Sequence, residues 1–179
     1  MKDNLSDIKT PEELLTFMSK NILYGYLSKE GKIYYQDDIN FANDFSKNYI
    51  LESEQDILKT KVGNCFDQVE FERNWFIKNN YEFKTFFMMV MLNYPNNYPM
   101  HSFLLYKDKL SNKWFYFENA AFKYRGIKEF LNINAAISYV KKWYEEDINN
   151  DFKDKIILKE YKKVEPHVNL EEYLDFILD

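Results

Sequence analysis

The sequence predicts an α+β fold in which a helix that bears the only cysteine packs on an antiparallel β-sheet, with further helices at its flanks. Residues 65–78 repeat apolar side chains at helical spacing. Segments 83–92, 101–106 and 114–119 are short, apolar and rich in aromatic residues, which is typical of strands. The polar turn 107–113 joins the last two strands, so we expect them to form an antiparallel hairpin.

The N-terminal third reads mainly as helical. Thr10 is placed to cap a helix that starts at Pro11, and Glu13 completes a capping box with Thr10. Gly25 and the following "SKEGK" break this helix. Residues 33–60 indicate two or three short helical pieces.

The chain after the hairpin alternates between helical and extended patterns. The stretch that begins at Ile127 carries two helical patches, the second over 134–147. Residues 155–161 read as an edge strand, and Asn169 is placed to cap a final short helix. The sequence therefore predicts one domain, 1–179, without an internal repeat.

The composition excludes several classes of protein. The chain has 179 residues, of which 46% are hydrophobic, and its formal net charge is −5 without a clustered basic face, so we expect no nucleic-acid partner. It lacks a long apolar run and a secretory leader pattern, so we expect no membrane partner. A single cysteine allows no internal disulfide and favours a reducing compartment, which predicts the cytoplasm.

Cys65 follows a Gly-Asn pair and opens the central helix, with Asn64 placed as its cap. The unpaired N–H groups of a helix N-terminus stabilise a thiolate, the reactive form of cysteine. A histidine can hold the proton and a third group can orient the imidazole, and the hairpin offers His101 together with Glu118 or Asn119. Zinc usually requires three or four protein ligands, so one cysteine and two dispersed histidines predict no metal site.

The register of the hairpin decides which residue orients His101, because a slip of one residue exchanges Glu118 and Asn119. We favour pairing His101 with Glu118, which yields two sensible cross-strand pairs, Phe103 with Tyr116 and Leu105 with Trp114.

The strings "GNC" (63–65), "HSF" (101–103) and "WFYFE" (114–118) resemble the motifs of the transglutaminase-like superfamily, including small bacterial members. The resemblance implies a papain-like core, a catalytic set of Cys65, His101 and Glu118, and no cofactor. It implies attack of a thiolate on a peptide-like amide through an acyl-enzyme, as in cysteine peptidases, amidases and transglutaminases. The family more often carries Asp where this chain has Glu118.

Other interpretations stay open. The same fold can serve as a binding module with an idle triad, or the chain can be an interaction protein on a different α+β fold, with Cys65 far from His101. Asn21 or Tyr24 are candidates for a second oxyanion donor beside the Cys65 N–H.

Asp67, Glu70 and Arg73 lie on one side of the central helix. They form either a salt-linked helix face or, in the case of Asp67 or Arg73, a support that fixes the loops beneath the site. His167 is expected at a helix entry.

Overall fold

The computed structural model describes residues 5–90, 99–148 and 150–179. Along the chain, in order, the elements are η1 (Leu5–Asp7), α1 (Pro11–Asn21), β1 (Gly25–Leu27), β2 (Ile33–Tyr35), α2 (Phe41–Asn48), α3 (Glu54–Thr60), α4 (Cys65–Lys78), β3 (Glu82–Val90), β4 (Met100–Lys107), β5 (Trp114–Glu118), η2 (Phe122–Tyr124), β6 (Gly126–Phe130), α5 (Ile133–Asp147), η3 (Asn150–Lys155), β7 (Ile156–Tyr161) and α6 (Leu170–Leu178).

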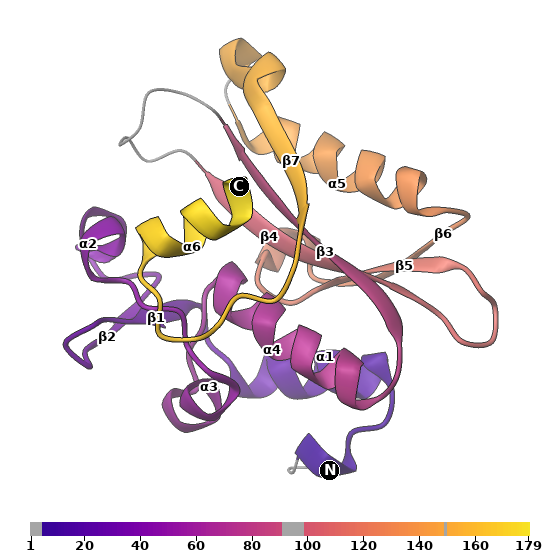
Figure 1. The fold of residues 1–179 in the computed structure, drawn as a ribbon, viewed down its shortest axis with the longest axis horizontal. Helices are drawn as coiled ribbons and strands as arrows, with labels where there is room; N and C mark the ends of the chain where they lie inside the picture. The colour runs from indigo at the N-terminus through magenta and orange to yellow at the C-terminus, as the bar shows by residue number, and fades with distance from the viewer. Residues whose placement is uncertain (1–4, 91–98, 149) are drawn as a thin grey trace.

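Among the residues that the structure describes, five antiparallel strands form the main sheet, in the order β6-β5-β4-β3-β7. A separate two-stranded hairpin is formed by β1 and β2. Figure 1 shows α4 on one side of the main sheet and α5 on the other. The predicted α+β class with an antiparallel sheet is confirmed.

The two faces of the sheet bury different sets of side chains, as the alternation along a strand requires. On the α4 side, Phe76 packs against Tyr106 and Phe117, with ring centroids 5.0 and 5.6 Å away. On the α5 side, Phe103 and Tyr116 share a buried cluster with Trp143 and other residues of α5. Burial on both faces explains why β3 and β4 read as nearly continuous apolar runs.

Local capping signals place the helix starts well. The capping box of Thr10 and Glu13 opens α1, Asn64 caps α4 over its predicted bounds, and Asn169 caps α6. The second patch after Ile127 is confirmed as α5, and the expected edge strand is β7. The strand predicted over 83–92 is observed as β3, while residues 91 and 92 lie outside the described residues.

One element was predicted wrongly and another was not predicted. The first patch after Ile127 is the strand β6, whose residues pair with β5 from Gly126 opposite Glu118 to Phe130 opposite Trp114. A five-residue run is too short for its periodicity to separate helix from strand, and pairing with β5 decides it. The hairpin of β1 and β2 was not expected either.

The favoured register of the hairpin was wrong by two residues. Leu105 lies opposite Tyr116, not Trp114, and the β4–β5 ladder ends where Leu104 meets Phe117. Because side chains alternate with a period of two, this shift keeps His101 and Glu118 on the same face of the sheet.

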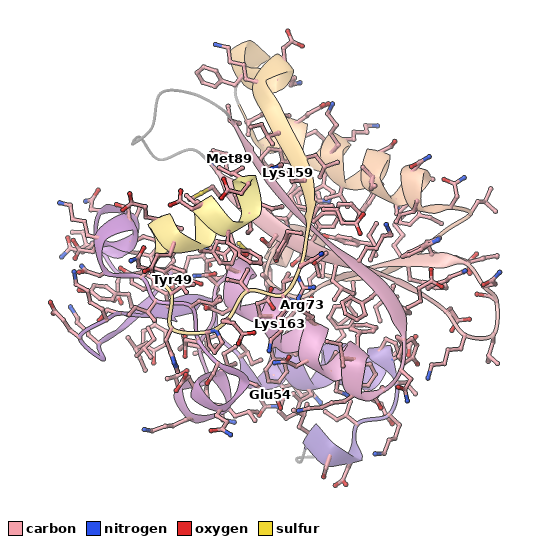
Figure 2. The ribbon with its side chains drawn as sticks, in the orientation of Figure 1. Tyr49, Glu54, Arg73, Met89, Lys159 and Lys163 are labelled. Carbon is pink, nitrogen blue, oxygen red and sulfur yellow. The ribbon has the colours of Figure 1, made fainter. Side chains whose placement is uncertain are left out.

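The segment after β7 crosses α4 before it enters α6 (Figure 1). Arg73 and Lys163 lie at this crossing (Figure 2). Arg73 Nε donates to Glu70 Oε2 at 2.9 Å, and its guanidinium lies over the ring of Tyr161. The salt link between Glu70 and Arg73 is therefore buried, where it joins α4 to the C-terminal segment, and it is not a solvated helix face.

None of the helices in the described part of the chain combines the length and the apolar character that a membrane span requires.

Candidate active site

Asn64 fixes the start of α4 and thereby the position of Cys65. Its side-chain oxygen accepts from the N–H groups of Phe66 (2.7 Å) and Asp67 (3.4 Å), and the Asp67 carboxylate accepts from the Asn64 N–H (2.9 Å). The cap uses the second and third N–H groups of the helix and leaves that of Cys65 aside. A cysteine in this position lies at the positive end of the helix dipole.

Asp67 also fastens the preceding loop. Its Oδ1 accepts from the Tyr49 hydroxyl and from the Glu52 N–H, both at 2.9 Å. Burial outweighs these bonds and raises the pKa of Asp67 to about 7, and burial together with the nearby charge of Asp67 raises the pKa of Glu52 to about 8. Of the two readings left open for this residue, the structure supports a role beneath the site, fixing neighbouring loops.

His101 begins β4 on the face that packs against α5. It lies opposite Met88 of β3, and its ring meets the edge of Trp143 with centroids 5.1 Å apart. His101 is 7% exposed, and Tyr124 stacks on Trp143 with ring centroids 4.3 Å apart. Aromatic side chains thus cover the imidazole and keep water away from it.

Glu118 is the residue that orients His101. His101 Nε2 donates to Glu118 Oε2 at 2.8 Å, which leaves Nδ1 as the ring nitrogen for another partner. The Tyr116 hydroxyl donates to the same Oε2 at 3.0 Å, and the Ala121 N–H donates to Oε1 at 2.8 Å. Both oxygens of the buried carboxylate therefore accept hydrogen bonds, three in all.

The charges of this pair stabilise one another. Burial disfavours the protonated ring of His101, but Glu118 and then a side-chain hydrogen bond with Cys65 outweigh it and raise the pKa of His101 to about 10. Burial likewise opposes ionisation of Glu118, yet His101 and the two further donors hold its pKa below the usual range. At neutral pH the pair is an imidazolium and a carboxylate.

Cys65 reaches His101 from the other side of the sheet. Its Sγ lies 3.8 Å from the carbonyl oxygen of Met100, and the residue shares the α4-side cluster with Ala120. The β4–β5 ladder stops at Leu104, so the first residues of β4 are not paired to β5. We call the unpaired stretch between the start of β4 and the end of β5 the notch, and we infer that the thiol and the imidazole meet there.

Tyr24, just before β1, adds a hydroxyl to the same place. Its hydroxyl forms a side-chain hydrogen bond with Cys65, and burial, followed by the charge and this bond of Cys65, raises the pKa of Tyr24 well above its usual range. Asn21, the other candidate oxyanion donor, instead donates to the carbonyl oxygen of Phe17 at 2.8 Å.

The structure thus brings Cys65, His101 and Glu118 together, as expected. Asn119 points to the α4 side and donates to Gln68, so it does not orient His101. His167 lies far along the chain, where it contacts Asp56 at 2.8 Å, with a left-handed backbone (φ 68°).

Sequence reasoning missed Tyr116 and Trp143. Tyr116 stands two residues before Glu118 and so shares its face, a signal that strand alternation offers. Trp143 comes from α5, and nothing in its own sequence context marks it as a neighbour of His101.

Within 5–90, 99–148 and 150–179, no three His, Cys, Asp or Glu side chains are grouped in a way that could hold a metal ion. Searches of protein-family models, curated proteins and solved structures find no match to this chain.

Proposed function

We propose that the protein is a transglutaminase-like cysteine hydrolase or acyltransferase that acts on a peptide-like amide. The observation that carries the proposal is the grouping of Cys65 at a helix N-terminus with a buried His101 that Glu118 orients. Three different elements, α4, β4 and β5, supply these residues. The order of a cysteine helix followed by antiparallel strands with the histidine and the acid supports a transglutaminase-like core.

The proposed reaction uses Cys65 as the nucleophile and the protonated His101, paired with Glu118, as the proton donor. The Cys65 thiolate attacks the carbonyl carbon, and the carbon–oxygen π electrons move to the oxygen. The tetrahedral intermediate then expels the amine, which takes its proton from His101, and a thioester remains on Cys65. His101 next removes a proton from water or from an acceptor amine, which attacks the thioester and restores the thiolate. Glu118 keeps the ring in the required orientation throughout.

The oxyanion formed in both steps needs two donors. The N–H of Cys65 lies at the first turn of α4, outside the Asn64 cap, and supplies one. The Tyr24 hydroxyl, which bonds the Cys65 side chain, supplies the other. Its raised pKa keeps the proton that a donor requires.

The single cysteine, which has no disulfide partner, supports a reducing compartment, and we place the protein in the cytoplasm.

One observation favours a second candidate, a binding module on the same fold. Cys65 is only 3% exposed, so a substrate can reach the sulfur only if covering side chains move. A binding module would keep the buried thiol as an inert apolar side chain.

Alkylation of Cys65 separates these candidates without knowledge of the substrate. Since Cys65 is the only cysteine, iodoacetamide labelling followed by intact-mass measurement reports on it alone. We expect labelling near pH 6 to be at least about tenfold faster than that of a free thiol, because the proposed nucleophile has a positively charged His101 beside it at the start of a helix.

Two variants control this experiment. His101→Ala removes the imidazolium and should abolish the fast labelling near pH 6, whereas His167→Ala, at the other histidine, should leave the rate unchanged. Labelling of the wild type that appears only on unfolding in urea would contradict the enzyme and favour the binding module.

A further inference from the structure

A single buried glutamine joins the loop before Cys65 to the end of the strand that carries Glu118. Gln68 Nε2 donates to the carbonyl oxygen of Gly63 at 2.7 Å. Gln68 Oε1 accepts from Asn119 Nδ2, also at 2.7 Å. Both amide side chains are almost fully enclosed, with exposed fractions of 1% and 0%. The two ends of the Gln68 amide are thus committed to two different segments of the site.

The segment after β5 depends on this link for its position. The β4–β5 ladder ends at Phe117, one residue before Glu118. Beyond Glu118 the chain is held by Gln68, which accepts from the Asn119 side chain, and by Arg125, whose Nε donates to the carbonyl oxygen of Asn119 at 2.8 Å. Side chains here take the place of the β4 ladder.

The loop before Cys65 is likewise held by hydrogen bonds to its backbone. Gly63 lies between the isolated bridge at Val62 and the Asn64 cap, and its N–H donates to the carbonyl oxygen of Leu23 at 3.1 Å. Gln68 holds the carbonyl of the same residue. The glutamine therefore spans the notch through which Cys65 reaches His101.

We propose that Gln68 and Asn119 are positioning residues that set the separation between the Cys65 sulfur and the His101–Glu118 pair. The inference rests on the proposed function, since it concerns the ion pair at that site. The bridge contacts neither sulfur nor imidazole and acts only through the two backbone segments that it ties. An ion pair weakens with distance, and a displacement of about 1 Å at a reactive centre can cost about 100-fold in rate.

The test compares two single variants with the wild type by the pH profile of iodoacetamide labelling between pH 5 and 9, and a control and a double variant follow. Gln68→Leu removes both bonds, and Asn119→Ala removes one and leaves the Gly63 link intact. We expect each to slow labelling near pH 6 by about tenfold or more, with Gln68→Leu the slower, because the ion pair loosens. Near pH 9, where a free thiol ionises without help, the rates should approach that of the wild type.

Thr85→Val is the matched control for lost stability. Thr85 is 1% exposed, and its hydroxyl donates to the carbonyl oxygen of Tyr161 at 2.7 Å and accepts from the guanidinium of Arg73. Like Gln68→Leu, its substitution therefore breaks two buried hydrogen bonds on the α4 side. We expect a lower urea midpoint with an unchanged labelling profile. If Thr85→Val slows labelling near pH 6 as much as Gln68→Leu does, general loosening explains the effect and the proposal is overturned.

Two further outcomes complete the test. The double variant Gln68→Leu/Asn119→Ala should label no more slowly than Gln68→Leu alone, and a fully additive loss would show that the two residues do not form one bridge. Wild-type rates in both single variants would overturn the positioning role while leaving the proposed function intact. If the wild-type protein itself shows no fast labelling near pH 6, the proposed function is contradicted. If Gln68→Leu does not fold, the labelling rate of Asn119→Ala tests the positioning role.

Discussion

At the scale of single residues, the site depends on how Glu118 shifts the charge of His101. The carboxylate accepts three hydrogen bonds and is 3% exposed, so its charge acts on the ring with little screening. Burial alone would lower the pKa of His101 and leave the ring neutral. The charge of the Glu118 carboxylate, followed by the hydrogen bond with Cys65, outweighs burial and raises the pKa of His101.

Glu118→Gln should therefore bring the pKa of His101 down from about 10 into or below the range of an ordinary histidine. The amide keeps the shape and one acceptor but loses the charge. Titration of the imidazole resonances by NMR measures the change, and His167 serves as an internal reference because it is the only other histidine. A His101 titration that is the same in the variant and the wild type would contradict the role of Glu118.

At the scale of elements, two helices carry the same cap in different settings. Asn64 opens α4 and Asn169 opens α6, each with an acidic residue three positions on that completes a capping box. Only the first of these helices begins at the proposed nucleophile. The pair therefore separates the general value of a cap from its effect on the site.

Asn64→Ala and Asn169→Ala should each lower the free energy of unfolding by about 1 kcal/mol, as lost caps usually do. Only Asn64→Ala should also slow the labelling of Cys65 near pH 6, because it frees the helix start that holds the sulfur. Urea unfolding and iodoacetamide labelling of both variants test this. Equal labelling rates in the two variants would show that the cap does not position Cys65.

The elements also show what a sequence can and cannot predict. Caps are local, so Thr10, Asn64 and Asn169 were placed correctly from a few neighbouring residues. The register of β4 on β5 is not local: the pairing differed by two residues, and Glu118 was still assigned correctly because an even shift preserves the face. The strand β6 was missed because pairing with β5, and not its own short pattern, makes it a strand.

The site likewise has some features that local sequence predicts and others that depend on the whole fold. Cys65 and the acid on β5 follow from a helix start and a strand end, which are features of single segments. The bridge from Gln68 to Asn119 joins residues 51 positions apart, and no periodicity relates them. The cover that Trp143 provides over His101 depends on how α5 docks on the sheet, which is decided by packing of the whole chain.

At the scale of the whole molecule, buried acids outnumber the cations that face them. Glu52, Asp67, Glu70 and Glu72 are all at most 5% exposed. Burial, the largest cause for each, raises the pKa of Glu52 to about 8 and those of Asp67 and Glu70 to about 7, and it raises that of Glu72 well above the usual range. Near neutral pH the fold therefore holds protons that the unfolded chain releases.

This excess fixes the sign of the pH dependence. Where the folded state binds more protons than the unfolded state, the free energy of unfolding falls as pH rises. For Glu52, Asp67 and Glu70 this holds from their ordinary pKa values near 4 up to their raised values of about 7 to 8, and Glu72, whose pKa burial also raises, acts in the same direction. His101, with its pKa raised to about 10, extends the decline above pH 6.5. Glu118 acts oppositely, but only on the acid side of its ordinary pKa.

We therefore expect the protein to be most stable near pH 5 and to lose unfolding free energy up to pH 8, at about 1.4 kcal/mol per pH unit for each carboxyl that stays protonated only in the fold. Urea unfolding followed by tryptophan fluorescence at pH 5, 6, 7 and 8 measures this loss. Glu52→Gln replaces one proton-binding carboxyl by a neutral amide and should flatten the decline, whereas Glu171→Gln, at an exposed acid of α6, should not. A free energy that stays level or rises between pH 5 and 8 would mean that these carboxyls ionise in the fold without cost, and the burial that defines the core around α4 would have to be looser than the structure shows.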